Sequence, residues 1–241
     1  MNYRKLVAGS WKLLLCALAV VPIAFAQSGT FEILLNGKPV GDATCNFTAG
    51  AQGYNSTSTV HVSMPGLDYS LSKTEKLSSS DELESVLLSG VVNREAVSIV
   101  ATPDSNQVVL DISANGRKTV SRLAAHPGAV LLPDFDPGAF ETLLALAVER
   151  NNRGVWAILP RKEGSIEPVE LVTYADEQGT LDGKSIAVHH LVAAIAGTKT
   201  DIFSSPENRL LQAELPQQGF ALVRNGFVLK PPARAGAPPA R

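Results

Sequence analysis

Apolar and polar residues alternate along most of the chain, in short segments that are separated by turn residues. In residues 60–64, Val and Met lie on one face and His and Ser on the other, which is the period of a half-buried antiparallel strand. Residues 108–113 repeat the pattern with Val, Leu and Ile on one face. Segments of this kind predict strands at 31–35, 38–47, 60–64, 69–73, 83–88, 96–101, 108–113, 119–123, 155–159, 168–174, 185–192, 199–203, 210–215, 220–223 and 227–229.

Turn signals lie between the predicted strands. Asn-Gly pairs at 36–37, 115–116 and 225–226 suit type I′ hairpin turns, because both central residues of such a turn need a positive φ. Other turns are predicted from composition at 65–66, 103–106, 177–179, 182–183 and 205–208. Short strands with a turn about every ten residues predict an all-β sandwich, barrel or half-barrel.

One segment after the N-terminus has the period of a helix instead. Residues 137–149 follow Asp136, a suitable N-cap, and begin with Pro137, whose missing N–H costs nothing at the first helical position. The apolar stripe of this segment, at the spacing i, i+3, i+4 and i+7, consists of Phe140, Leu143, Leu144 and Ala147. The pattern predicts one amphipathic helix between two runs of strands.

The predicted fold is mostly β: a strongly curved antiparallel sheet, half-barrel or barrel-like, with one short central amphipathic helix and a signal-peptide helix before it. Residues 27–230 are expected to form a single domain, because an apolar helix in the middle must be buried and does not resemble a linker. Two small β domains that hinge at the helix are the alternative.

The first 26 residues have the features of a secretory signal. Positive charges precede an apolar run at 13–26, and Ala24-Phe25-Ala26 is a small-x-small cleavage site. Cleavage would give an exported protein, periplasmic or secreted, with no stable transmembrane segment. An uncleaved anchor is the alternative, but the run is shorter than the ~20 residues that a span requires. At the other end, the Pro- and Ala-rich residues 231–241 are predicted to form a disordered tail.

Charge and cysteine content narrow the function classes. The formal net charge is −2, and removing the signal takes away Arg4, Lys5 and Lys12, so the mature chain is more acidic. With no basic run, no nucleic-acid partner is expected. The predicted mature chain keeps only Cys45, which excludes an internal disulfide. Cys45 is expected to be a small buried apolar residue, with a reactive or metal-binding thiol as the alternative.

Two motifs suggest chemistry but lack the geometry for it. Residues 70–73 match the S-x-x-K motif of penicillin-recognising serine enzymes, yet on a strand Ser70 and Lys73 point to opposite faces. His189 and His190 are adjacent on a predicted strand, so they cannot bind one metal ion without distortion. A metal site that joins them to the isolated His61 and His126 would require tertiary contacts.

Asp134 and Asp136 flank Phe135 just before the predicted helix. Such a carboxylate pair could perform acid–base work or bind a cation. Capping of the helix, whose N-terminus favours negative charge, is the preferred interpretation. We therefore predict no catalytic residue, no metal site and no cofactor.

Residues 31–41, FEILLNGKPVG, resemble the opening of a group of uncharacterised exported bacterial β proteins, with a strand, an Asn-Gly turn and a Lys-Pro-Val-Gly return. The resemblance extends over roughly 29–228 and includes a Gly-Thr-x-x-Asp strand and the closing strands RLLQAELPQQGFALVR at 209–224. It implies a strongly curved antiparallel sheet, loosely similar to lipoprotein carriers of the cell envelope. Its motifs are turn-and-strand patterns, so it transfers no functional residues.

Apolar surface remains as the feature that could carry function. A concave sheet that the helix covers only partly would leave a slot for a lipid or another apolar or amphiphilic ligand, or for a cell-envelope component. The alternatives are a module with a filled core that binds an envelope protein at an edge strand, and a hydrolase with a dispersed active site. The candidate ligand-lining residues are Val60, Val62, Met64, Leu71, Val108, Leu110, Ile112, Phe140, Leu144, Trp156, Ile158 and Val188.

Overall fold

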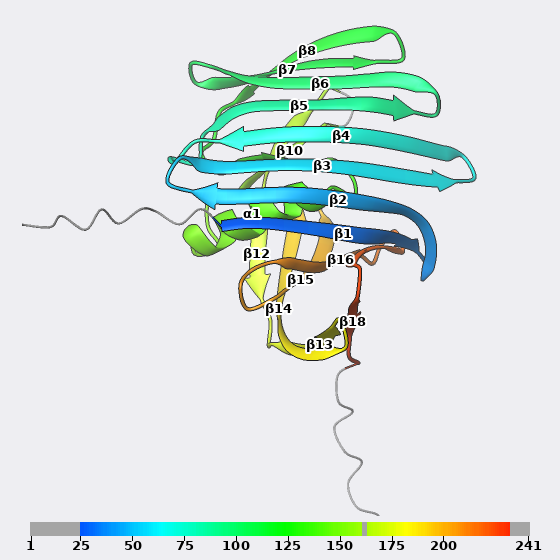
Figure 1. The fold of residues 1–241 in the computed structure, drawn as a ribbon. Helices are drawn as coiled ribbons and strands as arrows, with labels where there is room; N and C mark the ends of the chain where they lie inside the picture. Colours follow the sequence, from blue (N-terminus) through cyan, green and yellow to red (C-terminus); the bar gives the residue numbers. More distant parts are fainter. Residues whose placement is uncertain (1–24, 161–162, 232–241) are drawn as a thin grey trace, which may run out of the picture.

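The computed structural model describes residues 25–160 and 163–231 as a mostly β protein with one helix in that part of the chain (Figure 1). The helix α1 spans Pro137–Glu149. The strands are β1 (Phe25–Leu35), β2 (Lys38–Gly50), β3 (Gly53–Met64), β4 (Leu67–Leu77), β5 (Leu83–Val92), β6 (Glu95–Asp104), β7 (Gln107–Ala114), β8 (Arg117–Ala124), β9 (Ala129–Leu131), β10 (Trp156–Leu159), β11 (Ser165–Pro168), β12 (Glu170–Thr173), β13 (Glu177–Leu181), β14 (Lys184–Ile195), β15 (Thr198–Ser204), β16 (Leu210–Leu215), β17 (Phe220–Arg224) and β18 (Phe227–Leu229).

Most of the strands belong to one large antiparallel sheet of 15 strands. Its order is β18-β13-β14-β15-β16-β17-β1-β2-β3-β4-β5-β6-β7-β8, and β12 pairs with β14 beside this path. From β1 to β8 each strand pairs with the next along the chain, as hairpins do. The two runs of strands are joined where β1 pairs with β17, with Phe31 opposite Arg224. The N-terminal and C-terminal strands thus meet in the middle of the sheet.

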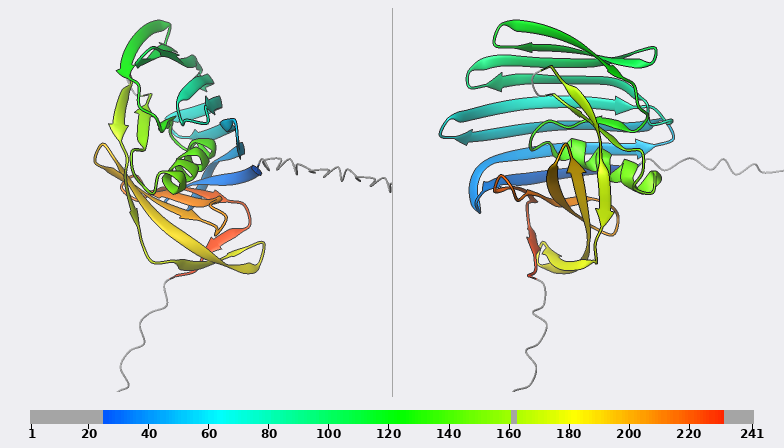
Figure 2. Two further views of the ribbon diagram at one scale, coloured as in Figure 1. Left: turned by 90° about the vertical axis from the view of Figure 1, so that its left-hand side faces the viewer. Right: turned by 180° about the vertical axis from the view of Figure 1, so that it is seen from behind.

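A second sheet is small and contains the only parallel pair among the described strands. β10 pairs in parallel with β9 and antiparallel with β11. A parallel pair needs a crossover connection, and here α1 provides it between β9 and β10. Figure 2 shows α1 and the small sheet on the same side of the large sheet. The helix therefore lies between two β layers.

The N-terminus of α1 forms as the sequence predicts. Asp136 is the N-cap, and its Oδ1 accepts hydrogen bonds from the backbone N–H groups of Gly138 and Ala139 at 2.8 and 3.2 Å. Pro137 takes the first helical position. The predicted apolar stripe is buried, but so are Glu141 and Thr142. Because it is covered on more than one face, the helix is a core element with contacts to β2, β3, β9 and β16.

The sequence pattern did not predict three of the strands or the start of a fourth. The predicted turn at 177–179 is wrong, because these residues begin β13. Gly179 pairs with Ile186 and Leu229, and a Cβ at this position would lie 2.7 Å from the ring of Phe227. The glycine therefore allows close packing inside a strand here and marks no turn. The polar start of β3 and the short strands β9 and β11 were also not predicted.

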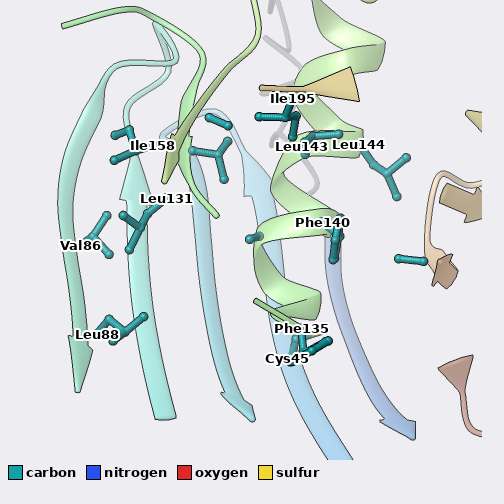
Figure 3. Close-up of a cluster of buried hydrophobic side chains, with 14 of the residues drawn as sticks. Cys45, Val86, Leu88, Leu131, Phe135, Phe140, Leu143, Leu144, Ile158 and Ile195 are labelled. Carbon is teal, nitrogen blue, oxygen red and sulfur yellow. The ribbon is translucent and has the colours of Figure 1, made fainter. Parts of the chain in front are cut away.

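Buried side chains fill the space between the sheets. Leu131 of β9 and Ile158 of β10 face Val86 and Leu88 of β5, and the helix side chains lie beside them (Figure 3). A second, smaller cluster contains Val188, Phe203, Leu211 and Phe227 at the other end of the large sheet. The interior behind the helix is packed rather than hollow.

The predicted signal and tail lie mostly outside the described residues. Residues 1–24 of the predicted signal and residues 232–241 of the predicted tail are outside the described ranges. Pro231, the first residue of the predicted tail, is described. The predicted cleavage point, between Ala26 and Gln27, lies inside β1, where these residues pair with Thr48 and Phe47. Over the described ranges, no helix has both the length and the apolar character needed to cross a membrane.

Candidate functional site

Charged groups are buried at the N-terminal end of α1. The Lys73 ammonium lies 2.8 Å from Asp136 Oδ2 and 2.9 Å from Glu75 Oε2, and all three side chains are nearly inaccessible to solvent. Lys73 also donates to the backbone oxygen of Leu131 at 3.1 Å, whose N–H donates to Glu75 Oε1 at 2.7 Å. One ion cluster therefore connects β4, β9 and the N-cap of the helix.

Opposite charges in this cluster offset part of the cost of burial, although burial still raises the pKa of Glu75. Burial alone lowers the pKa of Lys73, but Asp136 and Glu75 together raise it, so the ammonium is retained. Ser56 and Ser58 lie opposite Glu75 and Lys73 on β3, and their small side chains let Gly138 approach the sheet. This cluster has no opening to solvent at its charged atoms. Its geometry suits positioning of the helix, not binding of a ligand.

A cleft of about 560 Å³ opens at the other end of the helix. It lies between the last turns of α1, the start of β1, the hairpin of β2 and β3, and the loop between β15 and β16. Figure 1 shows the helix end beside the start of β1 and the end of β2. Its walls are mostly apolar, and its lining residues are Ala26, Gln27, Phe47, Ala49, Tyr54, Glu141, Ala145, Val148, Glu149, Glu207, Asn208 and Arg209.

One face of α1 supplies the helical wall of the cleft. Glu141, Ala145, Val148 and Glu149 fall at i, i+4, i+7 and i+8, so they project from the same side. This face differs from the apolar stripe that packs into the core. The helix therefore contacts the core with one side and the cleft with another.

Glu141 is the most deeply buried polar residue of the cleft, with 1% of its side chain exposed. Its Oε1 accepts from the backbone N–H of Leu210 at 3.1 Å and lies 3.3 Å from Arg224 Nη2. Its Oε2 is buried and has no hydrogen-bond partner. Burial raises the pKa of Glu141 to about 7, although Arg224 and the Leu210 N–H oppose the shift. This carboxyl group can therefore change its charge near neutral pH.

A second polar group lies on the wall formed by β1. Gln27 Oε1 is also buried without a hydrogen-bond partner. A buried oxygen that lacks a partner costs free energy, so two such atoms in one cleft are unusual. Both are acceptors, and a bound molecule that donates hydrogen bonds would satisfy them.

A tyrosine and a glutamate of the lining are hydrogen-bonded to each other. The Tyr54 hydroxyl donates a short hydrogen bond to Glu149 Oε2. Burial raises the pKa of Tyr54, and the neighbouring Glu149 raises it further. The ring of Tyr54 stacks on Phe47, with ring centroids 6.0 Å apart. The hydroxyl stays protonated and its hydrogen is occupied by Glu149, so it is not a free donor to a ligand.

The predicted ligand-lining residues lie elsewhere. They belong to the main buried cluster or pack against it, except Val188, which lies in the second cluster. Two of them border cavities: Phe140 lies at a small one of about 110 Å³ near Leu132, Pro133 and Thr200, and Val108 lies at one of about 570 Å³ near His126. The others are Val60, Val62, Met64, Leu71, Leu110, Ile112, Leu144, Trp156 and Ile158. Their role in binding a ligand stays a prediction.

The other candidate chemistries have plain structural explanations. Ser70 is exposed while Lys73 is buried, so the S-x-x-K pair lies on opposite faces of β4 as expected. Cys45 is buried, and burial raises the pKa of its thiol to about 12. His189 approaches Asp176 at 2.9 Å, and His190 approaches Asp201 at 2.8 Å. Within the ranges 25–160 and 163–231, no group of three or more His, Cys, Asp or Glu side chains could hold a metal ion.

Sequence reasoning missed the polar residues of the cleft. Glu141 and Glu149 lie on the helix at a spacing of two turns, with Ala145 between them, and this second stripe was readable from the sequence. Gln27 and Tyr54 gave no such signal, because they reach the cleft through the pairing of β1, β2 and β3. Only the tertiary arrangement places them beside the helix.

Comparisons with family models, with curated proteins and with solved structures give no match to this chain. The resemblance to exported bacterial β proteins therefore stays a prediction. Any function has to be argued from the cleft itself.

Proposed function

We propose that this protein binds an apolar or amphiphilic ligand in the cleft at the C-terminal end of α1, without transforming it chemically. The observation that supports this proposal is a cleft of about 560 Å³ with mostly apolar walls, in which a buried oxygen of Glu141 lacks a partner. Ligand sites commonly combine an apolar wall with a few buried polar groups that orient the ligand.

The packed interior favours this location over the slot predicted behind the helix. Phe140 and Leu144 are buried in the core, so a ligand there would have to displace them. The cleft requires no such displacement because it is open. A strongly curved, half-barrel sheet that wraps the helix is part of the same proposal, and the bend of the strands around α1 in Figure 2 supports it. Export to the periplasm or the outside belongs to the proposal as well; cleavage after Ala26 would remove that residue from the cleft wall and make Gln27 the N-terminus.

A module that binds an envelope protein at a sheet edge is the second candidate function. β8 is an edge strand of the large sheet, and its Val120 is 60% exposed. An exposed edge with apolar side chains can pair with a strand of another protein. A hydrolase finds less support, because the described histidines contact carboxylates or aromatic rings and none pairs with a nucleophile.

Blocking the cleft tests the ligand-binding proposal. Ala145 is partly buried and lines the cleft, so Ala145→Trp should fill it with an indole ring. We expect the variant to bind the neutral, environment-sensitive dye N-phenyl-1-naphthylamine at least about tenfold more weakly, a change of about 1.4 kcal/mol. The measurement is a fluorescence titration of wild type and variant.

Ala96→Trp is the matched control. Ala96 is exposed on β6 and lies outside the cleft, so its replacement by Trp should leave dye affinity unchanged. Equal dye binding by wild type and Ala145→Trp, or no binding by wild type, would contradict the proposal. Mass spectrometry of lipids that purify with the protein gives an independent check, since a ligand of this kind should remain bound in part.

A further inference from the structure

The polar atoms of the cleft are mostly hydrogen-bond acceptors. Glutamates at 141, 149 and 207 outnumber two arginines, Arg209 in the lining and Arg224 at Glu141, and Gln27 adds an unpartnered carbonyl oxygen. Ser205 donates to Glu207 at 2.8 Å, which lowers the pKa of that exposed carboxyl and keeps it ionised. The cleft therefore has negative formal charge and an excess of acceptors.

The donors that contact Glu141 and Glu149 are already occupied by the protein. The Tyr54 hydroxyl donates to Glu149, and the Leu210 N–H donates to Glu141 Oε1. The Arg224 guanidinium donates to Leu210 O at 2.7 Å and to Ser28 O at 3.0 Å, besides its contact with Glu141 Oε1. These bonds leave Glu141 Oε2 and Gln27 Oε1 without a donor.

From this arrangement we infer that the ligand is an amphiphile whose head group is a protonated amine, with the ammonium bound at Glu141 and the apolar body along the helical wall. The inference rests on the proposed function, because it names the class of ligand for the same cleft. An ammonium brings several N–H donors for the unpartnered oxygens and a positive charge for the excess of carboxylates. Ala145, Val148 and Phe47 provide the apolar surface for the body.

A fatty-acid head group fits the cleft less well. A carboxylate can pair only with Arg209, which is exposed, and exposed ion pairs contribute little. It would also lie among three glutamates and would leave both unpartnered oxygens without a donor. Glu141 Oε2 is closed to solvent, so the carboxyl group has to turn toward the cleft to meet an ammonium. The bond is then charge-assisted and screened from solvent, so it should count for more.

A matched set of ligands tests the inference. Decylamine, decanol and decanoate share one apolar chain and differ in the head group. The purified protein is loaded with the neutral dye at about pH 8, where the amine remains protonated, and each ligand is titrated below its micelle concentration. We expect decylamine to displace the dye at least about tenfold better than decanol, and decanoate to be the weakest.

Substitution of Glu141 connects this preference to a residue. Glu141→Gln keeps the size of the side chain and removes the charge, so the ratio of amine to alcohol affinity should fall to within about threefold. Glu32→Gln is the control, because Glu32 is exposed on β1 outside the cleft, and it should keep the wild-type ratio. Displacement by decanol reports on whether each variant still has an intact cleft.

The outcomes separate the inference from the proposed function. Displacement of the dye by decanol and decylamine with equal strength, or best displacement by decanoate, would overturn the inference while ligand binding stands. Failure of wild type to bind the dye at all would overturn both. If Glu141→Gln does not fold, Glu149→Gln at the exposed mouth replaces it. Its ratio of amine to alcohol affinity should fall by about half or more. An unchanged ratio in this variant would contradict the inference.

Discussion

A lysine on the buried face of a sheet needs an opposite charge beside it, and Lys73 has such partners. Inward positions of β4 are occupied by Tyr69, Leu71, Lys73, Glu75 and Leu77, so two charged residues follow the same period as the apolar ones. The sequence contains this pattern, but the partner that completes it, Asp136, comes from the start of the helix. This ion pair depends on the tertiary structure, so the alternation of residues along β4 does not predict it.

Removal of the Lys73 charge should destabilise the protein strongly. Lys73→Met leaves Glu75 and Asp136 buried without their counter-charge, which costs about 3–5 kcal/mol. Urea denaturation measures this loss as a drop in the free energy of unfolding. Lys76→Met is the control on the same strand, because Lys76 pairs with Glu84 at the surface and its loss should cost less than about 1 kcal/mol. Similar effects of the two substitutions would show that the ion cluster does not stabilise the fold.

Glu141 makes stability depend on pH in a direction opposite to that of a typical salt-bridged carboxylate. Burial raises its folded-state pKa from 4.5 to about 7, so the folded protein holds a proton that the unfolded chain has already released. This contribution to stability is present below about pH 4.5 and is lost as the pH rises through about 7. The groups that face Glu141 are Arg224, Arg209, the N–H of Leu210 and the thiol of Cys45.

The difference between wild type and Glu141→Gln isolates this effect. From about pH 4.5 to pH 8, wild type should lose on the order of 2–3 kcal/mol of unfolding free energy relative to the variant. Other carboxyl groups titrate in both proteins and cancel in the comparison. Urea denaturation at the two pH values measures this difference in unfolding free energy. Parallel pH profiles of wild type and Glu141→Gln would show that Glu141 is ionised normally in the folded protein.

At the scale of the element, α1 joins the two β layers and forms one wall of the cleft. Its start is defined locally by Asp136 and Pro137, so the sequence predicted its bounds at 137–149 correctly. Its surroundings could not be read in the same way. An amphipathic pattern suggests one covered face, whereas the neighbouring strands cover most of this helix.

A charge on the core side of the helix should disrupt its packing and destabilise the protein. Leu144 is 3% exposed and packs in the main cluster, so Leu144→Asp buries a carboxylate without a partner and should cost several kcal/mol, on the order of 3–5. Val148→Asp is the control one turn later, where the side chain is 58% exposed, and its cost should be below about 1 kcal/mol. Thermal denaturation compares them; an unchanged melting temperature for Leu144→Asp would mean that this face of the helix is not packed.

At the scale of the whole molecule, the large sheet joins strands from both ends of the described chain. Strands β1 to β8 follow one another in order, and this run was predictable from turn signals and alternation. The pairing of β1 with β17, the crossover through α1 and the small sheet were not, because they involve segments that are distant in sequence. The cleft lies where these distant segments meet, which explains why the predicted lining residues are in the core instead.

The sequence by itself determined the class of the fold, most of the strands and the helix with its cap, since these depend on local periodicity, turn chemistry and backbone preferences. Only the tertiary structure decided which polar residues are buried together and where a cleft remains. Burial of Glu141, its unpartnered oxygen and the match of Lys73 with Asp136 arise from packing between distant elements. Desolvation and pairing depend on neighbours in space, and a local pattern along the chain carries no information about them.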